Sequence, residues 1–231
     1  MTRKAELARN LESVQARIAA ACDRAGRSAD EVSLIVVTKT YPAADVKTLF
    51  ELGVRDVGEN RHQEAVAKFE ELQPTYSELR WHFLGGLQTN KAAAVVKYAD
   101  LVHSLDRFKL AQALNRAAEA AGRKISCLVQ VDFDTTNAAR AGLPATEVLG
   151  FVEQVAAQLA NIEVAGLMTV APLGAEPAPA FDGLQRLGAE LADLVPTATI
   201  LSAGMSDDFE TAISYGATHL RVGRLVLGQR L

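Results

Sequence analysis

The stretch SLIVVTKTYPAADVKTLFEL, residues 33–52, shows the repeating unit that decides the fold. It begins with a continuous apolar run (residues 33–38) and ends with apolar residues at helical spacing (residues 43–52). A Val/Ile/Leu run without alternation is typical of a parallel strand covered on both faces. The joining turn, Lys39-Thr40-Tyr41-Pro42, lacks the glycines that open a dinucleotide-binding sheet. The stretch therefore predicts a strand and a helix of a parallel sheet, and it favours a barrel over an open doubly wound sheet.

The same unit recurs along the chain. Eight apolar runs are expected to form strands, at residues 33–38, 54–57, 81–84, 101–103, 125–131, 164–170, 199–201 and 218–222. Helical spacing lies between them, at residues 43–52, 64–71, 107–121, 146–159, 180–194 and 207–215. An amphipathic helix precedes them, with Leu7, Leu11, Val14 and Ile18 on one face and Gly26 as its stop. We therefore expect an α/β protein, a single (β/α)8 TIM barrel in one domain of residues 1–231, with the helix of residues 1–27 packed on the barrel.

Length and composition argue against several classes of protein. The 231 residues suit one α/β barrel, which takes roughly 200–250 residues, and leave little room for a separate substrate domain. A net charge of −4 argues against a nucleic-acid partner. No apolar stretch approaches the roughly 18 residues of a membrane span, and the charged N-terminus is unlike a signal peptide. Cys22 and Cys127 have neither metal nor redox spacing, so we expect a cytoplasmic protein with no metal site and, in the absence of a membrane span, no membrane partner. The chain is long enough to bury its own core, which predicts a monomer.

Lys39 is the first candidate for chemistry, because barrels carry function at the C-terminal ends of their strands. A lysine beside so apolar a run is expected to be partly desolvated, which favours its neutral amine and makes Schiff-base chemistry accessible. The alternative is an ordinary surface lysine. Asn60, after the second run, could bind a ligand oxygen or cap the next helix. His82 lies in the third apolar run and is more typical of a core residue whose hydrogen bonds are satisfied. His62, His103 and His219 form no metal-ligand spacing with it.

The ends of the seventh and eighth runs predict a phosphate site. Small residues around Ser206 precede a helix, and Gly223 and Arg224 follow the last run. Barrels often bind phosphate after these two strands, although Ser206 or Asp207 could also be an ordinary N-cap. A lysine together with a phosphate site indicates a phosphate-bearing aldehyde, and pyridoxal 5′-phosphate fits that description. A phosphosugar aldolase fits less well, because the strand ends offer few carboxylates for acid–base work.

Several motifs, taken together, resemble the pyridoxal phosphate homeostasis protein family. They are VVTKT (36–40), GEN (58–60), WHFLG (81–85), LQTNK (87–91), GLMT (166–169), LSAGMSDD (201–208) and RVG (221–223). They run in order over residues 32–228. The resemblance implies one barrel, similar to the N-terminal domain of alanine racemase, with bound pyridoxal phosphate.

The resemblance also implies roles for individual residues. Lys39 is expected to form the Schiff base, and Arg221 to face the pyridine nitrogen, where a cation keeps that nitrogen unprotonated. Ser206 and the backbone of Gly223 and Arg224 are expected to bind the phosphate. The remaining cofactor-binding residues are expected to be Asn60, Met168 and Met205.

Three positions depart from the family pattern. Arg224 stands where many members have Thr or Ser, so a phosphate-binding hydroxyl is missing, and its guanidinium could reach the phosphate or turn to solvent. Ala203 stands where Met is common. The loop of residues 132–141 differs as well, with Arg140 roughly where a Lys is usual.

The expected function is intracellular homeostasis or carriage of pyridoxal phosphate without robust catalysis. A racemase needs two bases on opposite faces of its substrate, and alanine racemases take the second base from a further domain and a partner subunit. This chain ends soon after the eighth strand, at Leu231. A weak racemase or another pyridoxal-phosphate enzyme acting on amino acids stays the alternative, and apo-enzymes that use the cofactor are candidate partners.

Overall fold

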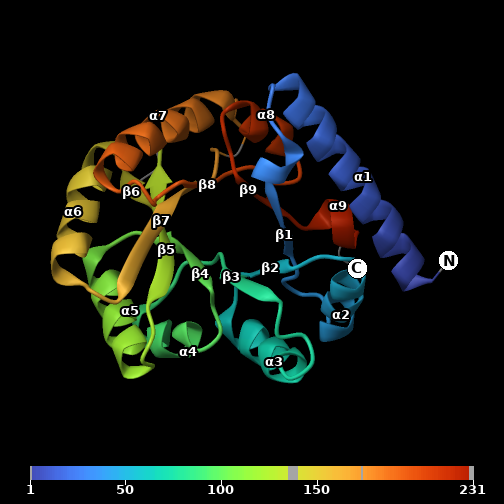
Figure 1. Ribbon diagram of the computed structural model, residues 1–231, viewed down its shortest axis with the longest axis horizontal. Helices are drawn as coiled ribbons and strands as arrows, with labels where there is room; N and C mark the ends of the chain where they lie inside the picture. The colour runs from blue at the N-terminus through green and yellow to red at the C-terminus, as the bar shows by residue number, and fades with distance from the viewer. Residues whose placement is uncertain (1, 135–139, 173, 229–231) are drawn as a thin grey trace.

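The computed structural model describes residues 2–134, 140–172 and 174–228, and in them eight parallel strands close into a barrel (Figure 1). This confirms the predicted TIM-barrel fold. The strands are β1 (Ser33–Val37), β2 (Asp56–Glu59), β3 (Arg80–Phe83), β4 (Leu101–Leu105), β5 (Ile125–Asp132), β7 (Ile162–Thr169), β8 (Ile200–Ser202) and β9 (His219–Val222). Each pairs with the next in this order, and β9 pairs with β1 to complete the ring.

Each predicted apolar run became a barrel strand, with ends shifted by a few residues. The pairing of β1 with β9 sets Ser33 beside His219 and Val36 beside Val222, so the two strands end at the same side of the barrel. A further short strand, β6 (Leu143–Pro144), pairs with the end of β5. The sequence did not predict β6, because two residues are too few to show a period.

Helices surround the strands on the outside of the barrel (Figure 1). They are α1 (Arg3–Arg24), α2 (Ala43–Glu51), α3 (His62–Leu72), α4 (Ala92–Val96), α5 (Phe108–Ala120), α6 (Val148–Gln158), α7 (Ala178–Leu194), α8 (Phe209–Ser214) and α9 (Arg224–Leu227). Short 3₁₀ helices lie at Ala29–Glu31, Thr89–Lys91 and Ala145–Glu147. The sequence missed α4 and α9, which have only one turn or so of helical spacing.

The N-terminal helix α1 packs beside α8 and α9 (Figure 1). Its apolar face is buried, as the spacing of Leu7 and Leu11 predicts. Asn10 donates a hydrogen bond to the Val226 carbonyl at 3.1 Å, and Arg17 forms an ion pair with Glu210 of α8. The first contact ties α1 to the short helix α9 after β9, and the second ties α1 to α8. No helix in the described ranges is both long enough and apolar enough to cross a membrane.

Candidate functional site

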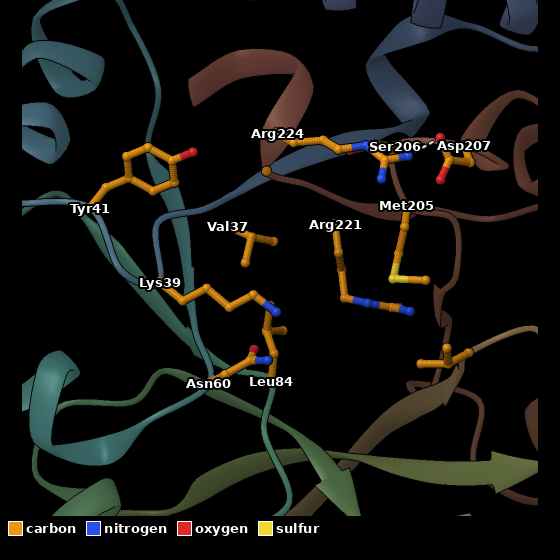
Figure 2. Close-up of a pocket in the computed structure, with 12 residues that line it drawn as sticks. Val37, Lys39, Tyr41, Asn60, Leu84, Met205, Ser206, Asp207, Arg221 and Arg224 are labelled. Carbon is orange, nitrogen blue, oxygen red and sulfur yellow. Dashed lines mark ion pairs between the residues drawn. The ribbon is translucent and has the colours of Figure 1, made fainter. Parts of the chain in front are cut away.

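A pocket of about 390 Å³ lies at the C-terminal ends of the strands, within the usual size range of small-molecule sites (Figure 2). Charged and apolar side chains from separate strand ends converge on it. Its lining residues are Val37, Lys39, Tyr41, Asn60, Leu84, Val170, Met205, Ser206, Asp207, Arg221, Gly223 and Arg224. This is the end of a barrel at which function is expected.

Lys39 enters the pocket from the turn after β1, with its side chain extending toward Arg221 (Figure 2). The next residue, Thr40, has a φ of 70°, in the left-handed region that non-glycine residues rarely adopt. Its N–H donates to the Glu64 carboxylate of α3 at 2.9 Å, which holds this turn. The backbone around the lysine is therefore fixed by a helix that follows the next strand.

A buried ion pair lies behind the lysine turn. The Lys68 amine is 2.6 Å from Glu59 Oε1 and also donates to the Thr38 carbonyl at 2.7 Å, while the Thr38 hydroxyl donates to the same Glu59 oxygen at 2.6 Å. Burial raises the pKa of Glu59, and its two donors oppose that rise. The cluster joins β1, β2 and α3 one residue before Lys39, and so fixes where the lysine side chain begins.

Asn60 follows β2 and lines the pocket beside Leu84. A Cβ at Gly85 would collide with the Asn60 carbonyl oxygen, so only glycine lets the chain after β3 pass so close. The GEN and WHFLG motifs therefore meet through a backbone contact.

Arg221 reaches the pocket from β9, although only 6% of it is exposed. Its Nη1 donates to Ser202 Oγ at 2.7 Å, and its Nη2 donates to the Thr169 carbonyl at 2.8 Å. Burial lowers its pKa to about 10, against the attraction of Asp208, so the guanidinium is still a cation at neutral pH. The pocket thus combines a lysine amine and a fixed cation (Figure 2).

The side of the pocket formed by β8 and β9 suits an anion. Ser206 precedes α8 and Gly223 precedes α9, and the first N–H groups of a helix lack intrahelical partners. A Cβ at Gly223 would lie 3.1 Å from the Val37 carbonyl oxygen, so glycine eases the close passage of β9 past β1. The Arg224 guanidinium pairs with the Asp207 carboxylate at the mouth (dashed in Figure 2).

Of the residues predicted from the sequence, one pocket brings together Lys39, Asn60, Met205, Ser206, Arg221, Gly223 and Arg224. Met168 is not among its lining residues. It is 2% exposed and packs with Leu101 and Leu128. Val170, which lies just beyond the end of β7, lines the pocket instead. Because Met168 lies on the strand itself, it sits one layer deeper, and its part in binding stays a prediction.

The sequence did not single out the apolar lining residues Val37, Leu84 and Val170. Their position at the ends of predicted strands, where a barrel carries its site, could have indicated them. Tyr41 also lines the pocket, and its hydroxyl donates to the Gly228 carbonyl at 2.8 Å.

The departures from the family pattern lie around this pocket and in the loop after β5. Ala203 is buried, directly after β8. Arg140 donates to Asp132 at 2.9 Å and to the Val170 carbonyl at 2.6 Å, so it supports a lining residue. Residues 135–139 of that loop lie outside the described residues. No group of three His, Cys, Asp or Glu in the described part of the chain could hold a metal ion.

Comparison with known proteins agrees with this geometry. Residues 9–230 match the family model described as alanine racemase, N-terminal domain. Proteins named pyridoxal phosphate homeostasis protein are similar over nearly full lengths. The one from Mycobacterium tuberculosis is 39% identical, over 99% of this chain and 94% of its own. The one from Escherichia coli K12 is 35% identical, over 97% of both.

Solved structures show the same fold. PipY of Synechococcus elongatus, in a structure with pyridoxal phosphate bound, is 35% identical with a TM-score of 0.83, over 96% of this chain and 100% of its own. A protein from Bifidobacterium adolescentis has a TM-score of 0.91 at 30% identity, over 97% of this chain and 95% of its own. Alanine racemase of Clostridium difficile, at 17% identity, shares the fold with a TM-score of 0.74, over 97% of this chain and 57% of its own. The chain therefore belongs to the pyridoxal phosphate homeostasis protein family, within the larger family of the alanine racemase N-terminal domain.

Proposed function

We propose that this protein binds pyridoxal 5′-phosphate covalently through Lys39 and acts in intracellular homeostasis or carriage of that cofactor. The observation that carries the proposal is the convergence of Lys39, Arg221 and the Ser206 turn on one pocket from three separate strand ends. The names of its relatives and the bound cofactor in PipY support the same conclusion.

The chemistry of the lining residues fits the cofactor. Pyridoxal phosphate supplies an aldehyde, with which a neutral lysine amine condenses as water is lost. Arg221 would face the ring nitrogen as a cation and so keep that nitrogen unprotonated. Ser206, the backbone of Gly223 and the guanidinium of Arg224 would hold the phosphate. Asn60 and Met205 would border the ring.

We propose carriage without robust catalysis because the described lining offers no second base set against Lys39. Tyr41 has its hydroxyl bonded to a backbone carbonyl, and the Asp207 side chain is 80% exposed at the mouth of the pocket. Wild-type protein incubated with the cofactor and amino acids in heavy water is expected to give no appreciable deuterium exchange at Cα. Exchange that disappears in Lys39→Ala would favour the alternative, a weak racemase-type enzyme.

Borohydride reduction followed by peptide mass spectrometry tests the binding site. We expect the added mass of the cofactor on Lys39 in wild-type protein and none in Lys39→Ala. Lys47→Ala, which removes an exposed lysine from α2, serves as the matched control and should be labelled like wild type. Label on another lysine, or no label on wild-type protein, would contradict the proposal.

We further propose that residues 1–231 act as one domain and as a monomer in the cytoplasm, where apo-enzymes that use the cofactor are its partners. The free, buried cysteines Cys22 and Cys127 suit a reducing compartment. Light scattering on a sizing column measures the mass in solution, and a dimer mass would contradict the monomer.

A further inference from the structure

A chain of buried hydrogen bonds leads from the pocket into the interior of the barrel. Arg221 Nη1 donates to Ser202 Oγ at 2.7 Å, and Ser202 Oγ is 3.0 Å from His103 Nδ1. His103 Nε2 is 3.0 Å from His82 Nδ1, and His82 Nε2 is 2.9 Å from Asp56 Oδ1. The five residues come from β9, β8, β4, β3 and β2, so the chain links five strands.

The side chains of this hydrogen-bonded chain are buried, so water cannot replace a missing hydrogen-bond partner. His103 and Ser202 are fully buried, and His82 is 4% exposed. A buried donor or acceptor that loses its partner incurs the full desolvation cost. Each residue of the hydrogen-bonded chain therefore has to supply the donor or acceptor that the next residue needs.

The two ends fix the direction of every bond between them. The Arg221 guanidinium can only donate, and an ionised Asp56 can only accept. With one proton on each imidazole, His82 donates from Nε2 to Asp56, and its Nδ1 accepts from His103 Nε2. His103 Nδ1 then accepts from the Ser202 hydroxyl, which itself accepts from Arg221. Each ring is thus held in one tautomer, with its proton on Nε2.

The charges around the chain agree with this assignment. Burial lowers the pKa of His103 well below its ordinary value, and the Arg221 cation lowers it further. Burial alone would raise the pKa of Asp56, but hydrogen bonds from Arg80 and His82 outweigh it and lower the pKa. The carboxylate therefore stays ionised at the far end.

We propose that His82 and His103 are positioning residues which, through Ser202, hold the Arg221 guanidinium in the pocket in the orientation that faces the ring nitrogen of the cofactor. The inference rests on the proposed function. Ser202 and the Thr169 carbonyl fix two of the five guanidinium N–H groups, and the remaining edge of the guanidinium is the part available to the pocket. Without the histidines behind it, the Ser202 hydroxyl has no acceptor and no set direction.

Ser202→Ala tests the chain by removing one hydroxyl. Ser104→Ala is the matched control, because the Ser104 hydroxyl on β4 is equally buried and has no hydrogen-bond partner in the described part of the protein. We expect Ser202→Ala to raise the Kd for pyridoxal phosphate at least about tenfold, or about 1.4 kcal/mol, and to shift the absorption band of the lysine-bound cofactor. Ser104→Ala should change neither. Equal binding and equal spectra for both variants and wild type would overturn the inference while leaving the proposed function intact.

Nitrogen-15 NMR of histidine-labelled protein without cofactor tests the same assignment independently. At about pH 8, above the ordinary histidine pKa of about 6.5, His82 and His103 should both give the signals of a ring protonated at Nε2 alone. The His103 signal should change in Ser202→Ala and stay unchanged in Ser104→Ala. A doubly protonated ring, or a proton on Nδ1 of either residue, would overturn the inference. If wild-type protein fails to bind the cofactor, the proposed function fails. The NMR result still decides whether the hydrogen-bonded chain from Arg221 to Asp56 exists.

Discussion

Arg224 lines the pocket at a position where the family resemblance implies Thr or Ser. Its guanidinium rests on the Asp207 carboxylate, and the two side chains are 55% and 80% exposed. Ion pairs this exposed contribute only about 0–1 kcal/mol. A doubly charged phosphate at the same place is therefore expected to compete well for the arginine, whose guanidinium would supply a donor in place of the hydroxyl that the resemblance implies.

We expect Arg224→Ala to weaken binding of pyridoxal phosphate by about 1.5–3 kcal/mol, the value of a charge-assisted hydrogen bond. Asp207→Asn should strengthen binding, since it removes a negative charge and a competitor for the guanidinium. Isothermal titration with each variant measures both effects. Arg186→Ala, which breaks an exposed ion pair on α7, is the control. An unchanged Kd in Arg224→Ala would mean that only the backbone binds phosphate there.

At the scale of elements, α3 is tied to the turn after β1. Lys68 bonds both Glu59 and the Thr38 carbonyl, and it is buried at 7% exposure. The turn that carries Lys39 is thus positioned by a helix that begins more than 20 residues further along the chain.

Lys68→Met should lower the free energy of unfolding by about 3–5 kcal/mol, because it leaves the Glu59 carboxylate buried without its cation. The double variant Lys68→Met/Glu59→Gln should recover part of that loss, since no charge remains unpaired. Urea unfolding followed by circular dichroism measures both. The single variant Glu59→Gln completes the comparison. If its loss in free energy of unfolding simply adds to that of Lys68→Met in the double variant, the two residues act independently.

At the scale of the whole molecule, the barrel strands carry two buried histidines, His82 and His103, and the partly buried His219 lies beside His82. Burial is the main cause that lowers the pKa of His219, to about 4, and the nearby Arg80 guanidinium lowers it further. In the unfolded chain a histidine has a pKa of about 6.5. Between these values the unfolded state binds more protons, so acidification favours unfolding.

We therefore expect stability to be highest above about pH 6.5 and to fall as the pH drops toward 4, with His219 contributing about 3 kcal/mol of that loss. The loss begins at the unfolded pKa and is complete at the folded one. His219→Gln should flatten the dependence. Urea unfolding between pH 7 and pH 4.5 measures the slope, and an equal slope in wild type and His219→Gln would contradict this assignment.

The sequence by itself determined the barrel and the elements that carry Lys39 and the Ser206 turn. These features can be recognised from neighbouring residues in the sequence. A continuous apolar run such as that before Lys39 predicts a buried parallel strand, and the small and polar residues around Ser206 predict the start of a helix. Two-residue β6 and one-turn α9 are too short to show such a period, so the sequence missed them.

Only the tertiary structure decided what stands behind and around those residues. The partners of Arg221, Ser202 and the Thr169 carbonyl, lie on β8 and β7, and Ser202 in turn contacts His103 on β4. Closure of the ring sets these distances. Met168 and Val170 share one apolar run, but how far β7 extends decides which of them reaches the mouth. Hydrophobic periodicity reports how one segment alternates along its own length. The depth of a side chain in a barrel depends on how neighbouring strands are staggered, and pairing between distant segments sets that stagger.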